Sequence, residues 1–450
     1  MSGIIERAHK QTHGVFAFEK RDGPPALREG LAALPEHLLN DEIFSRLDGS
    51  DLATLSVVSR GMCDAVASSG RTWWEAPEPL FAARLGYIGM LRRLLRRGRL
   101  TLRGDLCIAA ATGGHFELLR WLHDNGCGWH VGVSHALGAK GDLEMLKWAR
   151  VRGCPWNEQT CSEAAGGGHL EVLKWLRANG CPWNEGTCSR AAGRGHLEVL
   201  KWARRNGCPW DGWAPYIAAG NGHVEVLMWA HENGCPWDSG TCMKAAGHGQ
   251  LLTLIWLRRN GCPWDGLTCA HAAEGGHLEV LKWARANGCP WDEDTCEYAA
   301  RGGRLEVLKW AHENGCPWDE ETCSKAAGFG HLETLRWART RGCPWDWRTC
   351  LMAAKRGHLE VLKWARANGC PWTSDTCSYA AKGGHLQVLK WARANGCPWN
   401  WHAYRLACRK KRRGVVHWLK ANGCPTAEAT DDDLYTWTSG EDEWDPSDSE

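Results

Sequence analysis

The chain contains 450 residues, and its 54 Lys and Arg residues against 52 Asp and Glu residues give a formal net charge of +2 at pH 7. This balance excludes a protein that binds polyanions through bulk positive charge, and no apolar run is long enough to span a membrane. The 30 Trp and 23 Cys residues, against 6 Phe and 6 Tyr, indicate that one short pattern is copied many times.

The N-terminal part of the chain shows two patterns before any repetition begins. Residues 1–30 have no periodicity and no visible signal peptide, so we expect a flexible segment there. Residues 31–75 place apolar residues at helical spacing, with breaks at Gly49 and at Gly70. This pattern predicts a small separate domain of two or three short amphipathic helices.

The segment 31–75 resembles an F-box. The resemblance lies in Leu34, Pro35, Leu38, Leu39, Ile43, Phe44, Leu47, Asp51, Leu52, Leu55, Val58, Ser59 and Trp74, with one extra residue between Leu39 and Ile43 relative to the usual pattern. It implies that these helices dock on the Skp-type adaptor of a cullin-RING ubiquitin ligase. The residues expected to contact that adaptor are Leu34, Pro35, Leu38, Leu39, Ile43, Phe44, Leu47, Leu52, Leu55 and Val58. The alternative for this segment is a helical cap on the region that follows.

A strict repeat occupies most of the remaining chain. Cysteines recur every 27 residues from Cys127 to Cys424, and a degenerate unit precedes them between Pro79 and Gly98. A fixed period of this size is typical of a solenoid, in which each unit is too small to bury its own apolar face and stacks on its neighbours. We therefore predict about 13 stacked units over residues 76–425.

Each unit is predicted to form two helices. In TCSEAAGGGHLEVLKWLRANGCPWN, residues 160–184, the first helix is expected to begin at Thr160 as its N-cap and to carry the small Ala164 and Ala165. The second is expected to place Leu170, Leu173 and Leu176 on one side and a Glu171 and Lys174 pair on the other, and to end before Gly180. No strand pattern occurs, so the predicted fold class is all-α, a solenoid of helical hairpins.

This unit resembles an ankyrin repeat. The matching positions are Thr160, Ala164, Ala165, Gly168, His169, Glu171, Val172, Lys174, Leu176, Gly180 and Asn184. The ankyrin unit has about 33 residues, and the residues missing here fall where that family places its β-hairpin finger. The resemblance covers about three quarters of the chain and implies stacked helix pairs that bind other proteins.

The repeated Cys and His residues raise the possibility of metal or thiol chemistry. Their spacing, C-x6-C-x7-H, differs from the short C-x2-C clamp of structural zinc sites. The pattern also survives substitution, because Pro215 and Tyr404 replace the second Cys while Asp142, Gln250, Arg304 and Arg412 replace the His. Equivalent cysteines of adjacent units should lie about 9 to 10 Å apart, too far for a disulfide. We expect buried, reduced thiols, no metal, no cofactor and no catalysis.

Most Trp residues occupy two fixed positions of the unit. Twelve stand in the LKW slot and eleven in the CPW slot. The alternative for both sets is plain core packing, and we interpret the CPW set as covering the surface between units that the missing hairpin leaves bare.

Partner contacts are expected where the units differ. Two positions vary freely, the pair before the Thr of TC and the pair after its Cys, and the second includes Tyr216, Met243, Lys244, His271, Tyr298, Lys325, Met352 and Tyr379. Interface energy concentrates in Trp, Tyr and Arg. The predicted partner-contact residues are therefore Trp213, Tyr216, Tyr298, Trp347, Arg348, Tyr379 and Trp401.

The C-terminal end segregates charge. Arg409 to Arg413 read RKKRR, which fits a solvated cap, a nuclear import signal or a nucleic-acid contact. Residues 426–450 are acidic and expected to be disordered, and they could fold back on that basic end.

The sequence thus predicts an adaptor and not an enzyme. The expected partners are a Skp-type adaptor with its cullin-RING ligase and one unknown protein held by the repeats, with the chain a monomer outside that complex. The alternatives are a scaffold without a ligase connection and, third, a nucleic-acid binder that uses the Arg-rich ends. Such domain combinations occur in eukaryotes and large DNA viruses, so the expected compartment is the cytoplasm or nucleus, including those of an infected host cell.

Overall fold

The computed structural model describes residues 79–426. The segments predicted as a flexible N-terminus, an F-box-like domain and an acidic tail therefore lie outside the described residues, apart from Thr426. Within residues 79–426 all regular secondary structure is α-helical, and it forms thirteen consecutive helix pairs between Pro79 and Ala421. The predicted fold class, a solenoid of helical hairpins, is confirmed.

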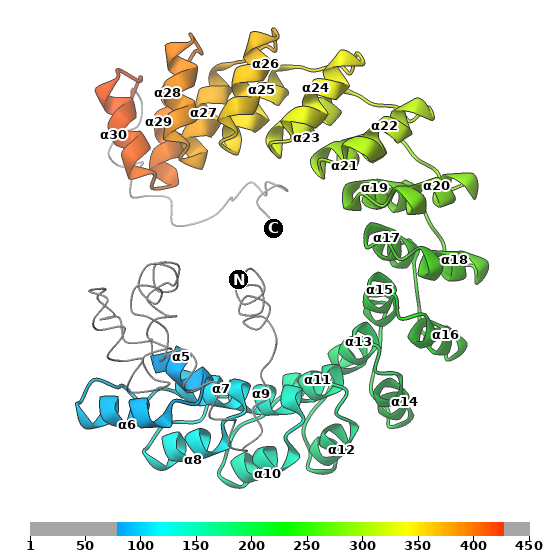
Figure 1. Cartoon of the computed structure of the whole chain (residues 1–450), viewed down its shortest axis with the longest axis vertical. Coiled ribbons are helices and arrows are strands. Elements are labelled where there is room, and N and C mark those ends of the chain that lie inside the picture. Colours follow the sequence, from blue (N-terminus) through cyan, green and yellow to red (C-terminus); the bar gives the residue numbers. More distant parts are fainter. Residues whose placement is uncertain (1–78, 427–450) are drawn as a thin grey trace, which may run out of the picture. The chain divides into compact units, whose positions relative to one another are not determined.

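The hairpins follow one another without a break along the chain (Figure 1). Their bounds are α5 (Pro79–Arg84) and α6 (Ile88–Arg96), α7 (Gly104–Gly113) and α8 (Phe116–Asp124), α9 (Gly132–Lys140) and α10 (Leu143–Val151), α11 (Glu158–Gly166) and α12 (Leu170–Ala178), α13 (Glu185–Gly193) and α14 (Leu197–Arg205), α15 (Trp213–Gly220) and α16 (Val224–Glu232), α17 (Ser239–Gly247) and α18 (Leu251–Arg259), α19 (Gly266–Gly275) and α20 (Leu278–Ala286), α21 (Glu293–Arg301) and α22 (Leu305–Glu313), α23 (Glu320–Gly328) and α24 (Leu332–Thr340), α25 (Trp347–Lys355) and α26 (Leu359–Ala367), α27 (Ser374–Gly383) and α28 (Leu386–Ala394), α29 (Trp401–Arg409) and α30 (Arg413–Ala421).

These hairpins belong to two compact units, which we describe separately. Among the described residues, the first comprises residues 79–137 and 144–155, and the second comprises residues 138–143 and 156–426. In the first unit α5 packs on α7, and in the second each first helix from α11 to α27 packs on the first helix of the next hairpin. Within the second unit the first helices form the inner side of a curved stack and the second helices its outer side (Figure 1).

The first helix begins earlier than the sequence predicted. In α11 the N-cap is Asn157, whose side-chain oxygen accepts a hydrogen bond from the backbone N–H of Gln159 at 3.1 Å. Thr160 lies at the third helical position, and its hydroxyl accepts from the backbone N–H of Asn157 at 3.4 Å. The prediction of Thr160 as N-cap was therefore wrong: the two side chains form a reciprocal capping box, and the residue after CPW is the cap.

The second helix follows the prediction more closely. Lys174 Nζ lies 2.7 Å from Glu171 Oε1, which is the expected surface pair. The buried residues of α12 are Val172, Leu173 and Leu176, whereas Leu170 is only half-buried, so the apolar stripe is shifted from the predicted one. The helix ends at Ala178, and Gly180 takes a left-handed conformation with φ of 79°.

Small and large side chains explain the curvature of the second unit. Ala164 and Ala165 of α11 are fully buried, and a methyl group lets neighbouring first helices approach closely. Indole rings fill the wider space between second helices: Trp183, in the loop after α12, meets Trp202 on α14 with 5.9 Å between centroids and 67° between planes. The CPW indole thus bridges adjacent hairpins, as interpreted from the sequence.

A cationic or aromatic side chain of the same hairpin also packs on the CPW indole ring. The guanidinium carbon of Arg177 lies 4.1 Å from the centroid of the Trp183 ring. His takes this place in three hairpins, where the stacked pairs are His123 with Trp129, His231 with Trp237, and His312 with Trp318. In these hairpins the bridging indole therefore contacts one flat group of its own hairpin and one of the next.

The repeated His residues join consecutive hairpins through a glycine turn. His169 Nε2 donates to the carbonyl oxygen of Ala139 at 3.0 Å. The same ring packs against Gly141, whose φ is 75° and where an added Cβ would lie 2.4 Å from His169 Nδ1. Where Arg replaces His the bond persists, because Arg304 Nε donates to the carbonyl oxygen of Glu274 at 2.9 Å. These residues connect hairpins, which explains why Arg substitutes for His without loss of the pattern.

The repeated Cys residues are buried, as predicted, and they are free thiols among residues 79–426. Most CPW thiols donate to the backbone carbonyl of the N-cap residue of the first helix in the same hairpin, for example Cys181 Sγ to Asn157 O at 3.4 Å. Sequence reasoning compared only equivalent cysteines and missed a second contact: thiols 20 residues apart within one hairpin meet, with 3.1 Å between Cys107 Sγ and Cys127 Sγ. The contact with Cys181 and burial both raise the pKa of Cys161. A thiol that keeps its proton is a poor nucleophile and metal ligand.

Candidate partner-binding surface

The variable positions of the units belong to the first helices, which form the inner side of the second unit (Figure 1). We call this surface the inner edge and define it as the two residues before the Thr position and the two after the Cys position of each first helix from α11 to α29. In α15 the Thr and Cys positions hold Ala214 and Pro215, and in α29 they hold Ala403 and Tyr404. Three predicted contact residues on the inner edge are exposed Trp side chains: Trp213 is 60 % exposed, Trp347 38 % and Trp401 37 %. Tyr216, Tyr298 and Tyr379 are half-buried on α15, α21 and α27. Exposed indoles at helix starts are unusual in a soluble surface and are the residues most often used for binding.

Aromatic rings and cations alternate along the inner edge. Trp213 meets Tyr216 edge to face, with 5.2 Å between centroids. Tyr379 lies between two lysines, whose Nζ atoms are 5.8 Å (Lys355) and 5.6 Å (Lys382) from its ring centroid. The cations hold the rings in place by cation–π attraction. The inner edge is therefore a fixed surface rather than a set of independent side chains.

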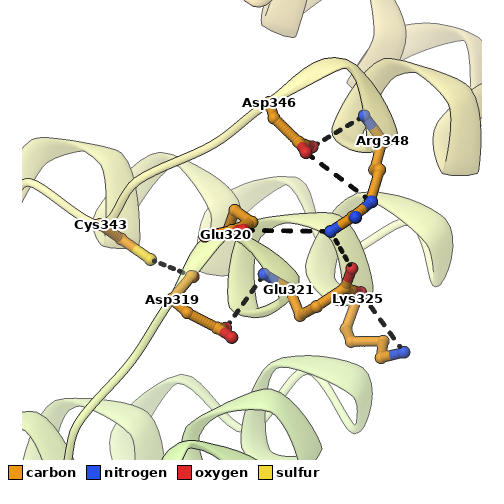
Figure 2. A network of polar contacts seen from close by, with 7 residues as sticks. All are labelled: Asp319, Glu320, Glu321, Lys325, Cys343, Asp346 and Arg348. Atoms are coloured by element: carbon orange, nitrogen blue, oxygen red, sulfur yellow. Dashed lines mark hydrogen bonds and ion pairs between the residues drawn. The ribbon is translucent and has the colours of Figure 1, made fainter.

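Arg348, another predicted contact residue, belongs to an ion-pair network between α23 and α25 (Figure 2). Its Nη1 lies 3.0 Å from Glu321 Oε1, and its Nε lies 3.7 Å from Asp346 Oδ2. Lys325 Nζ lies 3.6 Å from the other oxygen of Glu321. The structure thus places Arg348 in contacts that tie two hairpins together, in addition to its exposure at the inner edge.

The pKa of one carboxyl group in this region lies well above its usual value. Burial raises the pKa of Glu297 on α21 to about 7, and the charges of Asp319, Asp294 and Glu321 add to the increase while Lys325 opposes it. The inner edge therefore changes charge near neutral pH at this position. A partner that approaches here meets either a neutral acid or a carboxylate, depending on pH.

We expect Glu297→Gln to stabilise the protein at pH 8 by about 1 kcal/mol after discounting for solvent screening, and to leave stability unchanged near pH 4.5. Between about pH 4.5 and 7 the folded state keeps this proton and the unfolded state loses it, so the group's contribution to stability falls as pH rises. Thermal unfolding from pH 4.5 to 8 measures the effect, with Glu320→Gln as the control for removing a neighbouring negative charge. A difference independent of pH would contradict the assignment.

A pocket of about 330 Å³ opens on the inner edge beside α15, α17 and α19. Its lining includes Tyr216, Lys244 and His271, which sequence variation had marked, together with Glu274 and Arg304. The sequence analysis did not predict this pocket, because its members come from four hairpins. The available signal was Arg304, which interrupts the repeated His position.

The basic run Arg409 to Arg413 spans the turn between α29 and α30. All five residues are exposed, and Lys411 is the only non-glycine residue with positive φ (54°) among residues 79–426. Its exposure fits each of the three readings made from the sequence. Over the same residues no helix has the length and apolar character of a membrane span. No group of three or more His, Cys, Asp or Glu residues is placed to hold a metal ion in that part of the chain.

A repeat solenoid with side chains that vary along one edge defines a class of binding proteins. Residues 31–74 match the family model of the F-box domain, so the predicted F-box is confirmed. The chain therefore combines an F-box domain with a helical-hairpin solenoid, which is the architecture of a protein-interaction adaptor.

The solenoid also has counterparts among solved structures. The ankyrin repeat domain of human ASB11 is 18% identical, with 35% of this chain and 84% of that chain covered and a TM-score of 0.30. The pentatricopeptide repeat protein PPR10 in complex with an 18-nt psaJ RNA element is 16% identical, with 89% of this chain and 67% of that chain covered and a TM-score of 0.34. No curated protein matches the chain.

Proposed function

We propose that this protein is the substrate-recruiting subunit of a Skp-cullin-F-box ubiquitin ligase. The F-box match at residues 31–74 carries the proposal, because an F-box implies a Skp-type adaptor as its partner. The solenoid that follows supplies a second binding surface. One chain would then connect the ligase to the protein that is to be modified, in the cytoplasm or nucleus, and would perform no chemistry itself.

The inner edge is the surface that we propose holds the recruited protein. Trp213, Trp347 and Trp401 are the exposed large aromatic residues of its helices, and each stands at the start of a first helix. Tyr216, Tyr298, Tyr379 and Arg348 lie between them along the stack. A surface built from rigid aromatic rings loses little conformational entropy on binding, so contacts there contribute more to affinity than flexible side chains do.

The F-box itself supplies the decisive experiment. We expect the double substitution Leu34→Ala and Pro35→Ala to weaken binding to a Skp-type adaptor at least tenfold, because it removes an apolar anchor from the predicted contact. Co-purification of the full chain with the adaptor measures the effect, and Trp213→Ala, in the solenoid, is the control that should leave adaptor binding intact. Unchanged binding by the double variant would overturn the ligase connection. It would favour a scaffold in which residues 31–74 cap the repeats.

A further inference from the structure

The pocket beside α17 and α19 differs from the rest of the inner edge in shape and charge. Glycines open it, since Gly247 and Gly275 both line it and carry no side chain. Lys244, on α17, lies along α15, where a Cβ on Gly220 would be 2.9 Å from Lys244 Cγ. Its ammonium group is 5.3 Å from the ring centroid of Tyr216. The lysine is thus fixed by packing along its stem while its charge reaches the pocket.

Arg304 supplies a second charge because it occupies a place where most units have His. Its Nε makes the inter-hairpin bond to the carbonyl oxygen of Glu274 at 2.9 Å, the bond that Nε2 makes in His331 and its equivalents. A guanidinium has further N–H donors beyond Nε, which an imidazole bound in this way lacks. Arg304 lines the pocket, so those donors are at its wall.

The one carboxylate among the residues that line the pocket, that of Glu274, is already paired with a cationic side chain of the protein itself. Glu274 Oε1 lies 3.1 Å from Arg301 Nε, and its Oε2 lies 3.6 Å from His271 Nδ1. Burial lowers the pKa of His271, although Glu274 opposes this, so the imidazole contributes little charge at neutral pH. Lys244 and Arg304 therefore determine the sign of the pocket, which is positive.

We propose that this pocket receives an anionic side chain of the protein that the repeats recruit. The inference rests on the proposed function and adds the chemistry of the ligand to it. Lys244 would contribute a point charge and Arg304 directed N–H donors, a pairing suited to the oxygens of a carboxylate or a phosphate. Tyr216 and Met243 form the apolar part of the wall, against which the methylene groups of that side chain would pack.

Three short peptides test the proposal on the full chain. They share the sequence acetyl-Gly-Ser-Ala-X-Ala-Ser-Gly-amide, with Glu, phosphoserine or Gln at X, and binding is measured by ligand-observed NMR titration. We expect both anionic peptides to bind at least fivefold more tightly than the Gln peptide, since one charge-assisted hydrogen bond supplies a factor of that order. The ranking of the Glu and phosphoserine peptides identifies which anion the pocket prefers.

Two substitutions locate the site, and each has a matched control elsewhere in the stack. Lys244→Met keeps the aliphatic part of the side chain that packs on the glycine, since Met352 of α25 occupies the equivalent position and packs against Gly328 of α23. Arg304→His restores the residue that most units have there. Their controls are Lys325→Met, at the equivalent position of α23, and Arg412→His, since Arg412 makes the equivalent bond to Lys382 O at 3.2 Å. We expect each pocket variant to weaken anionic binding at least fivefold and each control less than twofold.

Three results would overturn the proposal. These are equal affinities for the Gln and anionic peptides, equal losses in pocket and control variants, and no measurable anionic binding at peptide concentrations up to about 10 mM. None of these concerns the F-box. Adaptor co-purification with Lys244→Met should match the unmodified chain, and failure of the ligase connection would appear only in the Leu34 and Pro35 experiment.

Discussion

We expect Trp264→Ala to lower the free energy of unfolding by about 3 kcal/mol, at the lower end of the range for removing a large aromatic side chain because the ring is only partly buried. Trp264 lies between two flat groups from consecutive hairpins. The guanidinium carbon of Arg258 is 4.1 Å from its ring centroid, and the ring of Trp283 is 5.9 Å away at 64°. The change removes a contact between neighbours, and in a solenoid such contacts supply the cooperativity.

The helices that Trp264→Ala destabilises provide a second test, besides the loss in free energy of unfolding. Denaturant unfolding gives the free energy, and amide hydrogen exchange should show faster opening concentrated in α18 (Leu251–Arg259) and α20 (Leu278–Ala286). Trp213→Ala is the matched control, because that indole is 60 % exposed and its loss should cost less than about 0.5 kcal/mol. Equal losses in the two variants would show that CPW indoles do not join the hairpins.

The second large effect is expected at a glycine turn. Gly303→Ala should destabilise the protein by about 3 kcal/mol, for two separate reasons. Gly303 has φ of 65°, which costs an L-residue about 1 kcal/mol. The new Cβ would also lie 2.5 Å from Nδ1 of His331, so the imidazole must move and lose its 3.0 Å bond to the carbonyl oxygen of Arg301.

Two controls separate these reasons. Gly315 has φ of 82° and no atom within 4 Å of an added Cβ, so Gly315→Ala measures the backbone cost alone and should be near 1 kcal/mol. In a His331→Ala background the extra cost of Gly303→Ala should disappear, because the clashing ring is absent. Thermal or denaturant unfolding of the four variants completes the cycle. A Gly303→Ala cost equal to that of Gly315→Ala would mean that the His ring does not fill the turn.

The helix pairs were predictable because their signals are local. The alanine pair, the GH turn and the LKW run of residues 160–184 recur with little change, and they give α11 and α12 in the structure. The N-cap was misplaced for a reason that is also local. Asn157 and Thr160 are both capping residues three positions apart, and only the hydrogen bonds show that Asn157 stands outside the helix while Thr160 lies within it.

The candidate site was predictable in part. Variation between units marked Trp213 and Tyr216, and in the structure Trp213 is exposed and its ring contacts that of Tyr216. The pocket was not predictable, because Lys244 and Arg304 are 60 residues apart in the sequence and line the same pocket only in the folded stack. The ion pairs of Arg348 were missed for the same reason, since Glu321 lies 27 residues before it.

The sequence by itself determined the hairpin, the number of hairpins and the burial of the thiols, because helix formation and the period of apolar residues depend on neighbours within one turn or one unit. Only the tertiary structure decided what the side chains that repeat from unit to unit contact. His169 and Ala139 are 30 residues apart, as are their equivalents along the stack. Contacts over that distance depend on the spacing and rotation between hairpins, which follow from how alanine and tryptophan pack on opposite sides of the stack.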